Sequence, residues 1–158
     1  MTHAQRRILV GIGNPIRGDD AIGLAVAREV NAGLKDLGVE FCELSAGGLT
    51  LIERLAGYTH AVIVDATISG SRRVGECYRL DWENGAVSQR TGGQHELGIA
   101  EGLELGRRTG MKLPDFLHIY VVEVADAFTF GTQLSPSVQA AVAPAANLIR
   151  AQEYGLGK

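Results

Sequence analysis

Hydrophobic residues occur along the chain in two patterns, gathered in short runs and as single residues spaced three or four positions apart. The short runs are rich in β-branched and aromatic residues and are bounded by Gly, Asp or Ser, which is typical of buried strands. They predict five strands, over residues 7–13, 39–44, 61–65, 76–80 and 117–124. The spaced pattern between these runs indicates helices.

The first predicted helix extends from Asp20 to about residue 34, because Ile22, Val26 and Val30 follow one another at helical spacing. A third helix is expected from about residue 95 to 107. Strands and helices therefore alternate along most of the chain. No linker, repeat or low-complexity segment interrupts this alternation.

Local signals predict where two other helices begin and end. Thr50-x-x-Glu53 matches a capping box and predicts a second, short helix. Ser135 followed by Pro136 predicts an N-cap with proline at the first helical position. Pro144 falls inside this last helix and is expected to kink or break it, because proline removes a backbone donor.

These elements predict an α/β fold: a single three-layer α/β/α domain over residues 1–158, with a mostly parallel or mixed central sheet of about five strands. A content of 46% hydrophobic residues is enough to build its core. In such folds ligands bind in the crevice beyond the carboxyl ends of the strands. Polar residues near the carboxyl ends of the strands are therefore the candidates for function.

Composition narrows the range of partners. A net charge of −3 argues against nucleic acid, because nucleic-acid-binding domains usually carry a basic face. No apolar run is long enough to span a bilayer and no signal-peptide cleavage site is present, so we expect a cytoplasmic protein without a membrane partner. Cys42 and Cys77 lack metal-site spacing and are expected to be reduced, buried core residues.

The segment GIGNPIRGDDAIG follows the first strand and opens the first helix. Gly11 and Gly13 fit the dinucleotide-binding fingerprint, but Ile16 occupies the position of its third glycine. Glu43, at the end of the second strand, could serve as the ribose-binding acid. A phosphate at this helix start would nevertheless be repelled by two adjacent carboxylates.

Asp19 and Asp20 are those two carboxylates. A helix cap accounts for one of them, with Asp19 the better candidate for the cap and Asp20 the better candidate to face the crevice.

Two further candidates come from other strand and helix ends. Asp65 closes the strand in HAVIVDATISG, where a turn residue is the simple alternative. His95 follows Gly92-Gly93 at a helix start, which keeps an imidazole neutral and able to bind metal. Asp20, Asp65 and His95 would supply the oxygen and nitrogen ligands that Zn, Ni, Mn or Fe accepts.

The four segments GIGNPIRGDDAIG, VIVDA, GGQHELG and LSPSV, in this order, resemble the [NiFe]-hydrogenase maturation endopeptidases over nearly the whole chain. The resemblance implies that Asp20, Asp65 and His95 are the catalytic and metal-contacting residues, with Asn14 and Asp19 supporting them. The chain departs from some members at two places. Ala21 stands where they have glycine, and Asp20 stands where they have glutamate.

The resemblance implies an endopeptidase that removes a C-terminal extension from a [NiFe]-hydrogenase large-subunit precursor after nickel insertion. The nickel would belong to the precursor, and the isolated protein could take up Zn or Cd at the same residues. The cut could use metal-activated water or a carboxylate acid/base pair. Two alternatives stay open, a non-catalytic metal-binding chaperone for the precursor and a nucleotide-binding oxidoreductase. Specificity would lie in loops 82–91 and 126–134.

Overall fold

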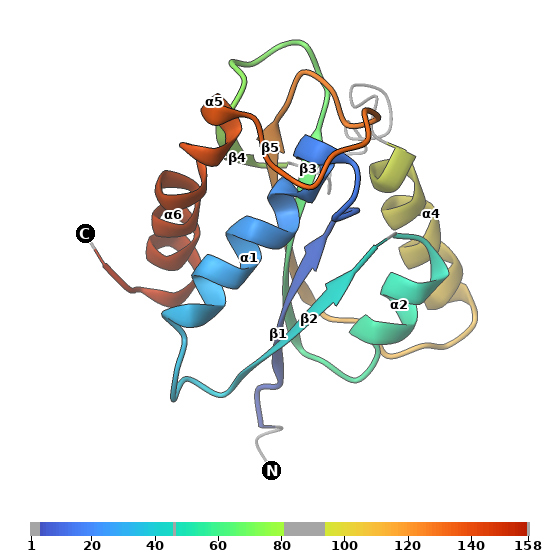
Figure 1. Cartoon of the computed structure of the whole chain (residues 1–158). Helices are drawn as coiled ribbons and strands as arrows, with labels where there is room; N and C mark the ends of the chain where they lie inside the picture. Colours follow the sequence, from blue (N-terminus) through green and yellow to red (C-terminus); the bar gives the residue numbers. More distant parts are fainter. Residues whose placement is uncertain (1–3, 46, 81–93, 158) are drawn as a thin grey trace.

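The chain folds around a five-stranded sheet that is covered by helices on both faces (Figure 1). The computed structural model describes residues 4–45, 47–80 and 94–157. The strands follow the spatial order β2-β1-β3-β5-β4. Their bounds are β1 Arg7–Ile12, β2 Val39–Leu44, β3 His60–Thr67, β4 Cys77–Arg79 and β5 Phe116–Glu123.

Four of the five strands run parallel. β1 lies between β2 and β3 and pairs in parallel with both, so that Arg7 is in register with Val39 on one side and His60 on the other. β3 pairs in parallel with β5, and only β4 is antiparallel. The carboxyl ends of β1, β2, β3 and β5 therefore point to one edge of the sheet, which we call the carboxyl edge, at the top of Figure 1.

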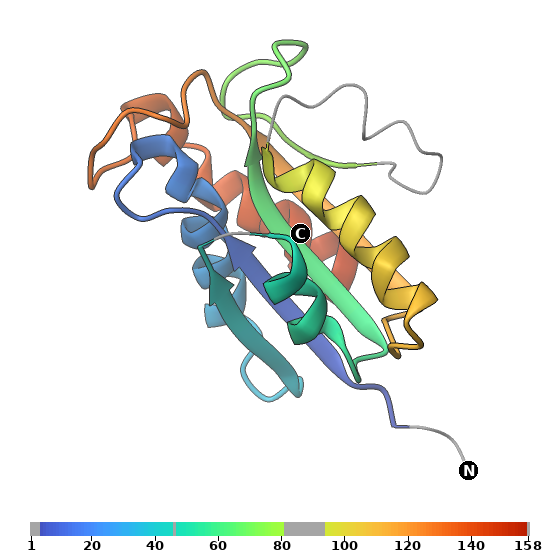
Figure 2. The same ribbon diagram turned by 90° about the vertical axis from the view of Figure 1, so that its right-hand side faces the viewer.

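Helices α1 and α6 cover one face of the sheet, and α2 and α4 cover the other, which faces the viewer in Figure 2. Alternate residues of β1 serve the two faces, since Leu9 packs with the core under α1 and α6, whereas Ile8 and Val10 pack under α2 and α4. The helices are η1 Gly18–Ala21, α1 Ile22–Ala32, α2 Leu49–Leu55, α4 Gln94–Arg108, α5 Pro136–Gln139 and α6 Val142–Tyr154.

The expected α/β/α architecture with a mostly parallel, mixed sheet is confirmed. All five predicted strands are present within a few residues of their expected bounds. β1, β3 and β5 are runs of buried, mostly apolar residues, whereas the border strands β2 and β4 are only partly buried. Helix α5 begins at the predicted Pro136, with Ser135 as its N-cap. No helix within the described ranges is long and apolar enough to cross a membrane.

Three predictions at helix ends are wrong. The first helix does not begin at Asp20, because a 3-10 turn precedes α1. The capping box at Thr50 is not formed, since α2 begins one residue earlier behind Gly48, with no side-chain hydrogen bond to its first turn. The last helical segment breaks between α5 and α6 rather than at Pro144, which lies in the first turn of α6, where its missing N–H has no intrahelical partner to lose.

Three glycines let α1 lie directly on the sheet. A Cβ atom on Gly23 would come 2.3 Å from the carbonyl oxygen of Ile12 and 2.7 Å from that of Val64. A Cβ on Gly13 would come 2.4 Å from the carbonyl oxygen of Asp20, and one on Gly11 would come 2.8 Å from Cβ of Ala27. The three contacts at Gly23 and Gly13 are with backbone, which cannot move aside. The glycines of this segment therefore serve close helix–strand packing.

Both cysteines lie on strands as free thiols, Cys42 on β2 and Cys77 on β4. They are half-buried, so the expectation of full burial is wrong, although both pack against the core clusters. Burial raises the pKa of both thiols, to about 12 for Cys77. A raised pKa leaves little thiolate at neutral pH.

Replacing Gly23 by alanine should destabilise the fold by about 1–3 kcal/mol, because the new methyl group would meet two backbone carbonyls. Urea denaturation measures this change. Gly131→Ala is the matched control, since a Cβ at position 131 has nothing within 4 Å, and it should unfold like the wild type. Equal stability of the two variants would show that α1 can move off the sheet at no cost.

Alkylation of Cys77 by iodoacetamide at pH 8 should be at least about 100-fold slower in the folded protein than in urea. With a pKa of about 12, only about one thiol in 10,000 is ionised at that pH, against roughly a quarter of unperturbed thiols. Mass spectrometry of the peptide that contains the cysteine measures the rate. Similar rates in the two states would show that the thiol is readily ionised on β4.

Candidate active site

The loop between β1 and η1 holds Asp20 at the carboxyl edge. Oδ1 of Asn14 accepts a hydrogen bond from the backbone N–H of Ile16 at 3.1 Å, which closes the turn. The backbone N–H of Asn14 donates to Oδ2 of Asp20 at 2.8 Å. Asp20 is only 6% exposed, and its other oxygen, Oδ1, has no donor among the described residues. The loop thus fixes one carboxylate oxygen and leaves the other without a described donor.

Asp65 occupies the same edge near the end of β3. It is fully buried, and its Oδ1 accepts a hydrogen bond from the backbone N–H of Ala66 at 2.8 Å. Element η1 contacts β3, and a Cβ on Gly23 would lie 2.9 Å from Cα of Asp65. The close packing of α1 therefore brings the turn that carries Asp20 against the strand end that carries Asp65.

His95 lies in the first turn of α4, which begins at Gln94. The amino end of this helix lies at the carboxyl edge of the sheet (Figures 1 and 2). The His95 side chain and the Gly92-Gly93 pair before the helix lie outside the described residues. The fold thus carries His95 on an element that begins at the edge where Asp20 and Asp65 lie, and its role as a ligand stays a prediction.

Asp19 does not cap the helix, and the cap interpretation is wrong for it. Neither η1 nor α1 has a side-chain hydrogen bond at its N-cap. Instead, the backbone N–H and the hydroxyl of Ser135 donate to the two oxygens of Asp19, at 2.7 and 2.8 Å. The carboxylate joins the first loop to the segment before α5. We call this pair of hydrogen bonds the Asp19–Ser135 clip.

Glu123, at the end of β5, is a buried carboxylate that sequence reasoning missed. It is 1% exposed and accepts hydrogen bonds from the backbone N–H of Ser69, at 2.8 Å, and from the hydroxyls of Ser69 and Tyr78. These contacts hold the loop that follows β3 over the carboxyl edge. The signal in the sequence was an acidic residue that interrupts the apolar run LHIYVVEV.

Glu43 is engaged in a way that argues against a ribose site. Its two carboxylate oxygens accept hydrogen bonds from Nε and Nη2 of Arg28 on α1, at 2.5 and 2.8 Å. This guanidinium lowers the pKa of Glu43. A ribose could bind Glu43 only by displacing Arg28 from this bidentate ion pair. The turn η1, directly before α1, also carries two carboxylates. The geometry therefore disfavours the nucleotide-binding alternative.

Two carboxylates on touching elements can bind a metal ion or exchange protons with a substrate. Within the described ranges, no group of three or more His, Cys, Asp and Glu side chains is arranged to hold a metal ion. Asp20 and Asp65 would therefore need a further ligand. The sequence offers His95 for that position, and a substrate could supply others.

Comparisons with known proteins bear on the family and the fold. A family model described as hydrogenase maturation protease matches residues 24–152, which is more than half of the chain. No curated protein matches the chain significantly.

Several solved structures share the fold. The hydrogenase maturating endopeptidase HybD from Escherichia coli is 29% identical, with a TM-score of 0.77, over 96% of this chain and 93% of that one. A second Escherichia coli endopeptidase structure is also 29% identical, with a TM-score of 0.75 and coverage of 95% and 94%. The maturation protease HybD from Thermococcus kodakarensis, at 21% identity, has the same fold, with a TM-score of 0.68 and coverage of 92% and 97%. The chain belongs to the hydrogenase maturation protease family, and it is an endopeptidase.

Proposed function

We propose that the protein removes a C-terminal extension from the large-subunit precursor of a [NiFe]-hydrogenase, and that it acts after nickel has been inserted. The observation that carries this proposal is the placement of Asp20 and Asp65 on touching elements at the carboxyl edge. The solved relatives are named as hydrogenase maturation endopeptidases, which fits this class of substrate.

Nickel enters the proposal as part of the substrate. The precursor already holds the ion, and Asp20, Asp65 and His95 would contact it from the side of the protease. Carboxylate oxygens and an imidazole nitrogen together form a donor set that nickel accepts. Contact with the ion would place the scissile peptide beside the two carboxylates. A precursor without nickel would bind less well and would not be aligned for cleavage.

The carboxylates can serve the hydrolysis directly. Water adds to the scissile carbonyl carbon, a carboxylate accepts the proton that water loses, and the same proton passes to the leaving amine as the C–N bond breaks. Oδ1 of Asp20 suits this role because no described donor contacts it. The nickel ion, when present, supplies a Lewis acid beside the carbonyl oxygen.

A covalent route through a thiol is disfavoured. Burial raises the pKa of both Cys42 and Cys77, so neither is a ready nucleophile near neutral pH. Cys42 lies on β2 and Cys77 on β4, at the two borders of the sheet, whereas Asp20 and Asp65 are held by β1 and β3. The reaction therefore rests on the carboxylates.

The purified protein should shorten the nickel-loaded precursor from the same organism and leave the nickel-free precursor intact. Intact-mass spectrometry of the precursor measures the loss at its C-terminus. Shortening of both forms would refute the nickel requirement. Binding of the loaded form without shortening would identify a chaperone, and neither binding nor shortening would refute the proposed substrate.

Asp65→Asn should lower the rate of processing at least about 100-fold while the melting temperature falls by less than about 4 °C. The asparagine oxygen can still accept the Ala66 hydrogen bond, and removal of a buried charge does not weaken the fold. Asp19→Asn is the matched control. It also removes one carboxylate charge, but Asn can keep a hydrogen bond to Ser135, so at least about a third of the activity should remain. If Asp65→Asn processes the precursor at the wild-type rate, the Asp65 carboxylate takes no part in the reaction and is only a turn residue.

A further inference from the structure

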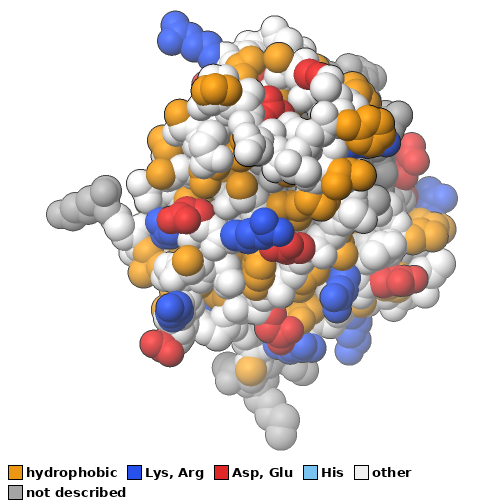
Figure 3. Space-filling view, viewed as in Figure 1, with side chains coloured by type: hydrophobic (Ala, Val, Ile, Leu, Met, Phe, Trp, Pro, Cys, Tyr) orange, Lys and Arg blue, Asp and Glu red, His pale blue; other side chains and the backbone are white. Residues whose placement is uncertain are grey.

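Large hydrophobic side chains that are exposed gather at one end of the molecule. Each of the four parallel strands is followed, beyond the carboxyl edge, by a segment that exposes at least one of them. These are Ile16 after β1, Leu49 after β2, Val74 after β3, and Phe128 and Phe130 after β5. Figure 3 shows hydrophobic side chains around the upper end of the molecule, where the loop after β5 lies. We call these five residues the apolar rim.

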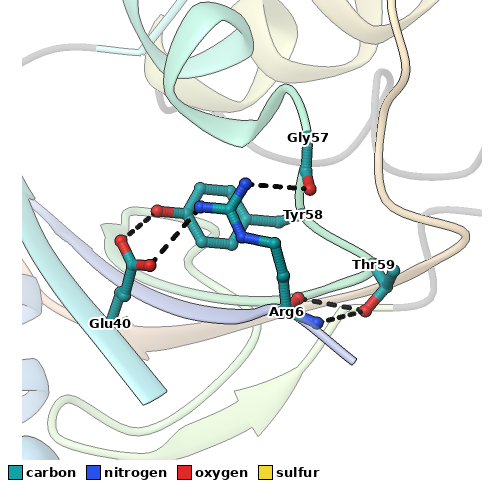
Figure 4. A network of polar contacts seen from close by, with 5 residues as sticks. All are labelled: Arg6, Glu40, Gly57, Tyr58 and Thr59. Carbon is teal, nitrogen blue, oxygen red and sulfur yellow. Dashed lines mark hydrogen bonds and ion pairs between the residues drawn. The ribbon is translucent and has the colours of Figure 1, made fainter. Parts of the chain in front are cut away.

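The opposite end of the sheet is polar. There the Arg6 guanidinium lies 4.6 Å from the centre of the Tyr58 ring and binds a carboxylate oxygen of Glu40 at 3.4 Å (Figure 4). The Tyr58 hydroxyl donates to the other oxygen of Glu40, and the backbone of Arg6 bonds to the Thr59 hydroxyl. Leu105 and Phe116 are the exposed large hydrophobic residues of the described part that lie away from the carboxyl edge. Five of the seven exposed large hydrophobic residues of the described part therefore lie at the edge that holds the candidate site.

The two loops that carry most of the rim are held together by backbone hydrogen bonds. The N–H of Gly18 donates to the carbonyl of Gly131, and the N–H of Gly131 donates to the carbonyl of Ile16, both at 2.9 Å. The Asp19–Ser135 clip fastens the same two segments a few residues further on. The exposed side chains therefore project from a braced pair of loops.

The aromatic part of the rim has its own local support. Oδ1 of Asp126 accepts the backbone N–H of Phe128 at 2.8 Å, which fixes the turn that presents both phenylalanines. Phe130 is 74% exposed, although the Arg17 guanidinium lies 5.9 Å from its ring centre. Solvating a phenylalanine on a fixed loop is unfavourable in the free protein, and covering it would recover that free energy.

The rim is continuous with the candidate site. Ile16 donates its N–H to the side chain of Asn14, whose own N–H holds Asp20. A polypeptide that reaches Asp20 must therefore pass beside this loop. The flanking charges are of both signs, with Arg17, Arg72 and Arg73 against Asp19, Glu76 and Asp126, and the chain is acidic overall. This balance does not suit an anionic membrane or a nucleic acid, which need a cluster of basic residues.

We propose that the apolar rim binds an apolar segment of the large-subunit precursor and so holds the scissile peptide over Asp20 and Asp65. This inference rests on the proposed function, because it takes the occupant to be the same substrate. The rim contributes affinity and leaves the chemical step to the carboxylates. Interactions of this kind act equally on the bound substrate and the transition state, so their loss appears in KM rather than in kcat.

The test compares the wild type with the double variant Phe128→Ser/Phe130→Ser on nickel-loaded precursor from the same organism. We expect KM and the Kd of precursor binding each to rise at least about tenfold, with kcat within about twofold of the wild type. Leu105→Ser is the matched control, since it removes an exposed apolar side chain of α4 away from the carboxyl edge. Its KM, kcat and Kd should equal those of the wild type.

Other outcomes would overturn the inference separately from the proposed function. If the wild type shortens the precursor and the double variant does so with the same KM and Kd, the rim does not bind substrate although the function stands. If sedimentation shows that the wild type self-associates and the double variant does not, with Kd unchanged, the rim binds a second copy of the chain. If the wild type neither binds nor shortens the precursor, both proposals fail.

Discussion

The close contact of α1 with β1 and β3 determines where the two candidate carboxylates, Asp20 and Asp65, lie. The contact is possible only because glycine stands at the positions where helix and strand backbones meet, since a methyl group on Gly23 would overlap two carbonyl oxygens. Packing at this distance presses η1 against the end of β3 and brings the Asp20 turn to Asp65. Interiors are packed too densely for such an overlap to be absorbed by small shifts. The geometry of the carboxylates thus follows from backbone packing.

This arrangement explains why a strand, a glycine-containing turn and a helix can look like a nucleotide-binding motif while their glycines serve helix–strand packing. In dinucleotide-binding folds the glycines admit a pyrophosphate to the helix start. Here the space beside the glycines is filled by backbone atoms of the neighbouring elements, and the turn η1 before α1 carries two carboxylates. The acid at the end of β2 is already paired with Arg28 from α1. The same strand–turn–helix unit can therefore favour an anion or disfavour one, and the side chains at the start of the helix decide which.

Regular elements were predictable from the sequence because their signals are local. Short runs rich in β-branched and aromatic residues predicted all five strands, and the Ser135-Pro136 pair predicted the start of α5. The partner of Asp19 was not predictable, because Ser135 lies 116 residues away and only the folded chain brings the two together. The missing capping box has a related cause: Gly48 permits α2 to begin earlier than the Thr50 pattern suggested. The positions of Asp20 and Asp65 at strand ends were readable, whereas the contacts that orient them were not.

The Asp19–Ser135 clip also determines when a growing chain can fix its first loop. The strand β5, which lies between β3 and β4, and the segment that supplies Ser135 both come from the last third of the sequence. Contacts between such distant segments form late, since the chain must first close a long loop. On the ribosome, the first loop with its acidic pair would emerge long before its brace. The loop that carries Asp19 and Asp20 is therefore braced only after the segment with Ser135 has been synthesised.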